Sequence, residues 1–301
     1  FSATPQSHYW DDPVNQAVMK AWQAGIVVVA SAGNTGPEAM TISIPGNVPY
    51  IITVGAMSDN YTPNNRTDDI LTSFSAAGPT VEGFVKPDVV APGGHISSVM
   101  ANNSFLALEH PEFHDGSIYF TMSGTSQAAA VTTGVVALML EANPALSPDE
   151  VKCRLMASAH PAITPNGDLA YSIFQQGAGQ ISAYYAVHYY NNDFGSNCAN
   201  QGLDIDADLA GTTHFGGRAN YDSATDNYYI MDLDGFAWSD GYAWSDGYWW
   251  NYAYYMWSDG FAWSDGYAWS DGFAWSDGYA WSDGFAWSDA QMAVNTWVPQ
   301  E

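Results

Sequence analysis

Residues 123–130 read Ser-Gly-Thr-Ser-Gln-Ala-Ala-Ala and lead into a small, apolar stretch that continues to Leu140. A tight Gly-Thr-Ser segment followed by such a run predicts a buried helix with Ser126 in its first turn. The unpaired N–H groups and the positive end of the helix dipole stabilise negative charge at that position. Ser126 is therefore a candidate nucleophile whose oxyanion is bound by its own amide, and a serine that merely caps the helix is the alternative.

Length and charge limit the classes of protein to which the chain can belong. With 301 residues, 47% of them hydrophobic, the chain can bury a large core. A formal net charge of −26 with only 6 Lys and Arg argues against binding to nucleic acids or to anionic membranes. No apolar run is long enough to cross a bilayer. The two cysteines, Cys153 and Cys198, allow one disulfide without requiring it.

The order of helical and strand patterns predicts a layered α/β fold. Residues 13–24 have a helical apolar face, and residues 26–30 (IVVVA) are typical of a parallel strand buried on both faces. A glycine-rich loop, residues 31–37, follows that strand at the end where open α/β sheets bind ligands. Further strands are expected at 50–56, 71–75 and 86–93, helices from Ser147 to 159 and at 181–189, and irregular structure at 94–118.

Several motifs in this region, taken in their order, resemble the subtilisin-like serine proteases, the subtilase family. The likeness covers residues 10–188 and corresponds to the C-terminal two-thirds of the family's protease domain. It implies a three-layer fold with a parallel sheet and flanking helices, incomplete at its N-terminal side, and we assign residues 1–190 to it. The motifs are GIVVVASAGN at 25–34, IPGNVP at 44–49, TVGA at 53–56, SFS at 73–75 with GP at 78–79, KPDVVAPG at 86–93, SGTS at 123–126, SPDEVK at 147–152 and GAGQISA at 177–183.

The resemblance assigns roles to individual residues. Ser126 matches the family's nucleophile, and Asn34 matches the side-chain donor of its oxyanion hole, whereas without the resemblance Asn34 reads as a turn residue. The Ile44–Pro45 bond matches a position that is cis in the family. The residues implied to contact substrate are Ser31, Ala32 and Gly33 along the specificity pocket, with Gly124 and Thr125 beside the nucleophile.

The catalytic Asp and His of subtilases come from segments upstream of the Asn34 motif, and the chain begins too late to include them. None of its seven histidines matches the family's motif, so we expect them to be surface or structural residues: His8, His95, His110, His114, His160, His188 and His214. The expected partners are then an N-terminal fragment of the same protease that carries Asp and His, and a peptide substrate. The alternative is a subtilase fold kept as a scaffold without catalysis. The resemblance implies an extracellular or cell-surface location.

Residues 191–234 are rich in Asn, Asp and Gly and predict a linker or irregular packing. In a strand, Asp204, Asp206 and Asp208 would line one face. Such a face is a weak candidate for a structural calcium site, and a solvated acidic edge is the favoured interpretation. We expect no other cofactor.

A six-residue repeat, Gly-(Phe/Tyr)-Ala-Trp-Ser-Asp, fills residues 235–289 and is followed by a tail, 290–301. Its Asp-Gly pairs and alternating aromatic residues predict an all-β region, either a narrow meander or a β-solenoid. WSDG repeats of this type resemble tails on some bacterial secreted subtilases. The repeat surface could pack within the protein, assemble copies into a filament or surface layer, or stack on sugars. It carries Trp238, Trp244, Trp257, Trp263, Trp269, Trp275, Trp281 and Trp287.

Overall fold

The computed structural model describes residues 3–63, 65–164, 168–188 and 199–230. At its centre is β2 (Ile52–Ser58), every residue of which is buried. The strands β1 (Val29–Ser31) and β4 (Val89–Pro92) pair with β2 in parallel, and β3 (Ile70–Leu71) pairs antiparallel with its end. The parallel α/β core expected from the sequence is therefore present. The aromatic repeat at 235–289, its tryptophans and the tail at 290–301 lie outside the described residues.

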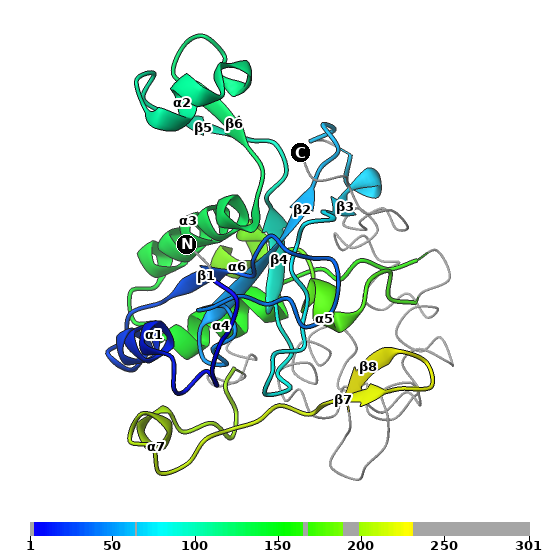
Figure 1. Ribbon diagram of the computed structural model, residues 1–301. Coiled ribbons are helices and arrows are strands. Elements are labelled where there is room, and N and C mark those ends of the chain that lie inside the picture. Colours follow the sequence, from blue (N-terminus) through cyan, green and yellow to red (C-terminus); the bar gives the residue numbers. More distant parts are fainter. Residues whose placement is uncertain (1–2, 64, 165–167, 189–198, 231–301) are drawn as a thin grey trace.

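Helices pack around this sheet. The long helix α3 (Thr125–Ala142) contacts β1, β2 and β4, and α6 (Ala183–His188) packs on α3 (Figure 1). The helix α4 (Pro148–Ala157) begins at the predicted Ser147, which forms a reciprocal capping box with Glu150. The helix α1 (Pro13–Gln23) is capped by Asp12, whose side chain accepts from two backbone N–H groups. The short α5 (Ile173–Gln176) precedes α6.

None of the helices in the described ranges is long and apolar enough to cross a membrane.

Two strand predictions need correction. Of the apolar run at 26–30, only its end joins β1, and Ile26 is 58% exposed. The expectation that the whole run is buried on both faces is wrong: Ile26 is exposed, residues 27–29 are only partly buried, and Ala30 alone is buried. The strand expected at 71–75 is reduced to β3, because the chain turns at Thr72, whose carbonyl accepts from the N–H of Ser75.

The irregular structure expected at 94–118 is instead an ordered hairpin, which we call the arm (residues 96–122). It consists of β5 (Ile96–Val99) and β6 (Tyr119–Met122), paired antiparallel, with α2 (Phe105–Glu109) and the 3₁₀ turn η2 (Pro111–Phe113) between them. A second 3₁₀ turn, η1 (Arg66–Asp68), precedes β3. The arm rises from the body at the top of Figure 1.

The segment from residue 199 to residue 230 packs on the body. It forms α7 (Ile205–Leu209) and the hairpin of β7 (Ala219–Asp222) with β8 (Asn227–Ile230), and its apolar side chains join the main core. Asp204, Asp206 and Asp208 therefore belong to α7 and its cap, and not to a strand that would line their carboxylates on one face. The expected solvated edge is also wrong for Asp208, whose buried carboxylate accepts from Tyr9 Oη at 2.5 Å and Tyr50 Oη at 3.0 Å.

A stack of three rings fastens the same segment to the start of the chain. The indole of Trp10 lies between the imidazoles of His8 and His214, with centroid distances of 4.4 and 4.5 Å. Each imidazole also faces a carboxylate: His8 Nδ1 lies 3.2 Å from Glu82, and His214 Nδ1 lies 2.8 Å from Asp208. Both carboxylates have buried side chains. The two ends of the described chain thus pack against each other.

A buried ionic cluster lies beneath the sheet. The carboxylate of Asp88 on the β4 side contacts Lys86 Nζ at 2.7 Å and Lys152 Nζ at 3.2 Å, and it accepts from the backbone N–H of Thr53. Both ammonium groups also donate to backbone carbonyls, Lys86 to Ile51 and Lys152 to Pro49. Two lysines thus share one carboxylate away from water.

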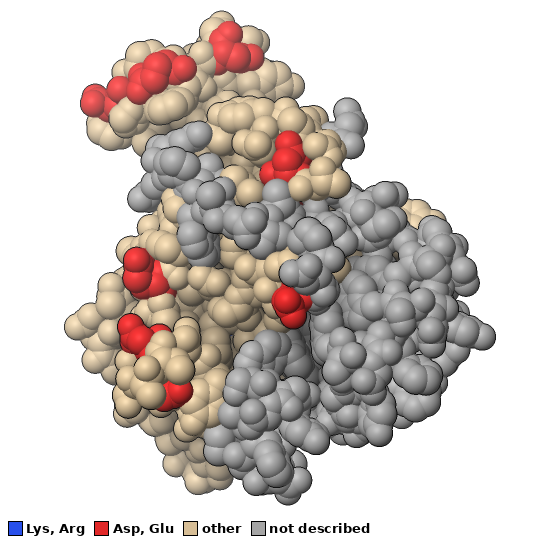
Figure 2. Space-filling model, turned by 90° about the vertical axis from the view of Figure 1, so that its right-hand side faces the viewer, with Lys and Arg blue, Asp and Glu red and all other residues tan. Residues whose placement is uncertain are grey.

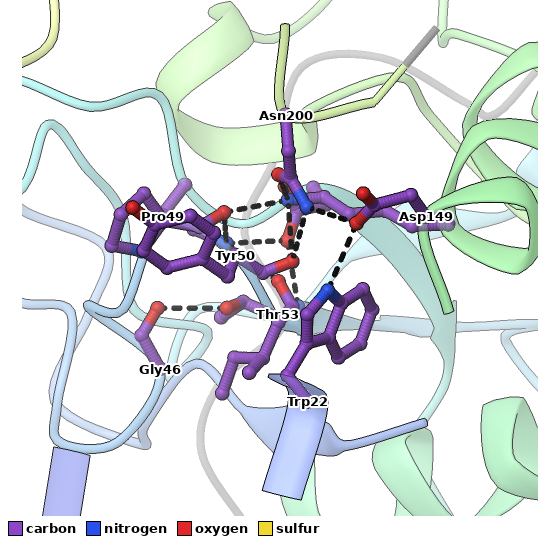
Figure 3. Close-up of polar contacts among 11 residues, drawn as sticks. Trp22, Gly46, Pro49, Tyr50, Thr53, Asp149 and Asn200 are labelled. Atoms are coloured by element: carbon purple, nitrogen blue, oxygen red, sulfur yellow. Dashed lines mark hydrogen bonds and ion pairs between the residues drawn. The ribbon is translucent and has the colours of Figure 1, made fainter. Parts of the chain in front are cut away.

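Side-chain amides extend this cluster to other elements. Asn200 donates to the carbonyl of Tyr50 at 3.0 Å and to Asp149, and its Oδ1 accepts from Lys152 (Figure 3). Asp149 in turn accepts from the indole N–H of Trp22 at 2.9 Å. The cluster therefore joins α1, α4, β2 and the segment after residue 199. On α4, Cys153 is buried and disulfide-bonded, and the chain's other cysteine, Cys198, lies outside the described residues.

Below pH 7, where Lys86 is protonated, replacing Asp88 by Asn is expected to lower the free energy of unfolding by about 3–5 kcal/mol, because it removes the counter-charge of two buried ammonium groups. Urea unfolding followed by circular dichroism measures the effect. The matched control is Asp11→Asn, an exposed aspartate, for which the change should stay within about 0.5 kcal/mol. Equal effects of the two substitutions would contradict a structural role for the cluster.

Burial lowers the pKa of Lys86 from 10.5 to about 7, although Asp88 opposes the shift. Between these values the unfolded chain binds more protons than the folded chain, so Lys86 makes stability rise with pH. The free energy of unfolding of the wild type minus that of Lys86→Met should therefore increase from pH 7 to pH 9, by up to about 1.4 kcal/mol per unit. Urea titrations at pH 7, 8 and 9 test this, and a difference that stays flat or falls would refute the shift.

Candidate active site

Ser126 is the second residue of α3, and it is exposed. The turn before it is anchored to the loop that follows β4: the N–H of Gly124 donates to the carbonyl of Gly93 at 2.8 Å, and the N–H of His95 donates to Ser123 Oγ at 2.9 Å. These bonds hold the N-terminus of α3 at the carboxyl end of the parallel strands. The predicted position of Ser126 in a first helical turn is thus observed.

The side-chain amide of Asn34 lies against the start of α3, and two hydrogen bonds fix its orientation. Its Oδ1 accepts from the backbone N–H of Thr125 at 2.9 Å and from Thr125 Oγ1 at 2.8 Å. The Thr125 hydroxyl also accepts from the N–H of Gly33 at 3.2 Å. Because Oδ1 is engaged twice, the network assigns the other amide atom, Nδ2, as the free donor. A side chain on Gly124 would place its Cβ 3.2 Å from Nδ2, so this donor lies beside the backbone that leads to Ser126.

The neighbouring loop brings the other predicted residues to the same place. Ser31 ends β1, and the buried Ala32 donates to the carbonyl of Val54 at 2.9 Å. Gly33 has φ +117°, and a Cβ there would lie 2.9 Å from Ser43 Oγ, so both its conformation and its packing require glycine. The Ile44–Pro45 peptide is cis, as the resemblance implied.

The described histidines do not complete this arrangement. Within the described ranges, none of them hydrogen-bonds to Ser126. Two of the histidines, both on the arm, contact other side chains instead. His110 lies 3.3 Å from Glu112, and His114 lies 3.1 Å from Asn102. The described residues thus bring together a candidate nucleophile and two candidate oxyanion donors, Asn34 Nδ2 and the N–H of Ser126, and no histidine among them reaches Ser126 to serve as a base.

The three aspartates considered for calcium do not converge. Asp204 caps α7 by accepting from the N–H groups of Asp206 and Ala207, Asp206 accepts from Gln23, and Asp208 binds the two tyrosines. Across the ranges that the structure covers, no group of three His, Cys, Asp or Glu side chains could hold a metal ion.

Residues 2–196 match the subtilase family, Peptidase_S8. The chain belongs to this family.

Three relatives show how much of a subtilase the chain covers. It is 50% identical over 145 residues to serine protease AprX of Bacillus subtilis (48% of this chain, 33% of AprX). It is 31% identical over 163 residues to the halolysin-like extracellular serine protease Nep of Natrialba magadii (54% and 23%). Fervidolysin of Fervidobacterium pennivorans, a keratinolytic enzyme related to subtilisin, matches with a TM-score of 0.44 and 27% identity (57% and 24%). The chain thus spans about a third or less of the length of these proteins.

The role of Thr125 in orienting Asn34 was missed by the sequence reasoning on this subtilase, which assigned Thr125 to substrate contact. The two residues are 91 positions apart, and no spacing rule links them. The contact between Thr125 and Asn34 can be recognised only in the folded structure, where the two residues lie next to each other.

Replacing Thr125 by Val keeps the shape of the side chain and removes its hydroxyl. Thr125 is 1% exposed, so the N–H of Gly33 loses its acceptor inside the protein, and stability should fall by about 1–3 kcal/mol. The control is Thr133→Val on the same helix, an exposed threonine whose hydroxyl donates to Ala129. Urea unfolding measures the stability of both variants. A Thr125→Val variant as stable as Thr133→Val would contradict a stabilising role for the bond between Gly33 N–H and Thr125 Oγ1.

Proposed function

We propose that the chain supplies the nucleophile and the oxyanion hole of a subtilisin-type serine endopeptidase. The observation that supports this most directly is the orientation of Asn34. Thr125, the residue before Ser126, engages Asn34 Oδ1 twice and leaves Nδ2 free next to the helix start. A donor fixed in advance costs no reorganisation when charge develops on the substrate.

In this mechanism Ser126 Oγ attacks the carbonyl carbon of a peptide bond, and a base takes the hydroxyl proton. The carbonyl oxygen becomes negative and is bound by Asn34 Nδ2 and by the N–H of Ser126 at the positive end of α3. Collapse of the intermediate returns the proton to the leaving amine and leaves an acyl group on Ser126. Water then releases this group by the same steps in reverse order.

The base and the aspartate that orients it come, in this proposal, from an N-terminal piece of the same protease. Helix α3 supports this: it carries one charged residue, Glu141, and most of its residues from Ala128 onward are small or apolar, a composition typical of a buried helix. Yet Ala130, Ala137 and Leu138 on one side of it are exposed. The adjacent β1 pairs with one strand only among the described residues. A further strand and helix would cover both features.

The substrate class that follows is a peptide or polypeptide, and the proposed location is extracellular or at the cell surface. The name of the Natrialba relative, an extracellular protease, supports the location. Peptide specificity depends on pocket walls beyond Ser31, Ala32 and Gly33.

The test is labelling by a fluorophosphonate probe of the protein together with its N-terminal piece. We expect labelling at Ser126, none in Ser126→Ala, and a loss of about 10²–10³ in kcat for Asn34→Leu, the cost of one oxyanion donor in subtilisin. Thr35→Ala, an exposed neighbour of Asn34, serves as the control and should keep full activity. Failure of the complete protein to label would favour a non-catalytic scaffold.

A further inference from the structure

The arm is an ordered projection. Its own small core contains the buried Ala107 and Phe120, and Phe113 packs edge-on against Phe120 at 6.2 Å. Ser104 caps α2, and Asp115 accepts from the N–H groups of Ser117 and Tyr119 at the far turn. The arm therefore presents its outer side chains in fixed positions.

Those outer side chains are mostly large and apolar. Phe105 is 75% exposed and Leu108 is 65% exposed on α2, and Val99 and Tyr119 form an exposed cross-strand pair on the hairpin. Side chains of this kind seldom gather on a free surface, so their concentration indicates an interface. The exposed members are Val99, Phe105, Leu106, Leu108, Phe113, Ile118 and Tyr119.

The arm carries the acidic side chains of Glu109, Glu112 and Asp115, and residues 94–122 contain no Lys or Arg. Two histidines lie beside the acids, His110 at Glu112 and His114 at Asp115. Figure 2 shows acidic side chains on the projecting lobe, with no basic side chain in view. A second copy of the chain, with its net charge of −26 and with Lys86 and Lys152 buried, would be repelled. The complementary partner is apolar and basic.

The arm also stands next to the candidate nucleophile. Strand β6 ends at Met122, and the chain passes directly through Ser123 into the helix start with Ser126. A polypeptide whose scissile bond lies at Ser126 passes the base of the arm. The four-residue strands make the hairpin about 13 Å long, so a substrate must extend about four residues beyond the site to reach α2.

We propose that the arm is an exosite, a second binding site for the polypeptide substrate that recognises a segment with apolar side chains flanked by Lys or Arg. The apolar residues on α2 and the hairpin bury the substrate's apolar side chains, and Glu109, Glu112 and Asp115 pair with its basic residues. The exosite rests on the proposed peptidase function and adds a preference for long, basic-apolar substrates.

The experiment compares a four-residue chromogenic peptide with peptides in which the same cleavage sequence carries a twelve-residue Leu- and Lys-rich extension on either side. For the complete protein, one extended peptide should be cleaved with kcat/KM at least tenfold above the short peptide, through a lower KM. The double variant Phe105→Ser and Leu108→Ser should lose this advantage, and the short peptide serves as the internal reference. Replacing Lys by Glu in the extension should also remove it.

The matched control is Val81→Ser, an apolar residue that is 57% exposed outside the arm, and it should keep the advantage. An advantage that survives in the double variant, or its absence in the wild type, would overturn the exosite. If the complete protein neither labels nor cleaves, the peptidase proposal fails instead. Binding of the fluorescent extended peptide to Ser126→Ala, with and without the two arm substitutions, then decides the exosite by anisotropy.

Discussion

One buried carboxylate, that of Asp88, determines how the layers of this protein fit together. It faces Lys86 and Lys152 without water between them, so a single negative charge balances two potential positive charges. Such a cluster adds little net stability compared with apolar packing, but it tolerates few alternative arrangements. Because Lys152 belongs to α4 and Asp88 also accepts from Thr53 in β2, the cluster fixes helix and sheet relative to each other.

The sheet determines the geometry of the candidate active site. Asn34 follows β1, and Gly93 follows β4, so both loops leave the carboxyl ends of strands that are paired with β2. The helix start is bonded to both loops, through Thr125 to Asn34 and through Gly124 to Gly93. A shift of register in either strand would therefore separate the donor from Ser126.

Local signals in the sequence predicted a large share of this arrangement. The start of α3, the cap of α4 and the loop at Asn34 each depend on a few consecutive residues. Contacts between distant residues could not be predicted in this way. Thr125 and Asn34 meet across 91 positions, and Asp208 is buried because Tyr9 and Tyr50 donate to it from the other end of the chain. The alternation of Asp204, Asp206 and Asp208 fits one face of a strand, but these residues belong to α7 and its cap. Asp204 caps this helix, and Ile205 and Leu209 pack against the core. The sequence of the arm has no regular apolar period, so it predicts irregular structure and does not reveal the hairpin.

The bond between Tyr9 and Asp208 bears on where the folding unit ends. Residues matched to the subtilase family stop at 196, yet the acceptor of the buried Tyr9 and Tyr50 hydroxyls lies at 208. The contact joins positions that are 199 apart, and the stacked rings of His8, Trp10 and His214 lie beside it. A boundary drawn at the end of the family match would cut through the core. The cooperative unit extends at least to Ile230, which is buried in the same core as β2.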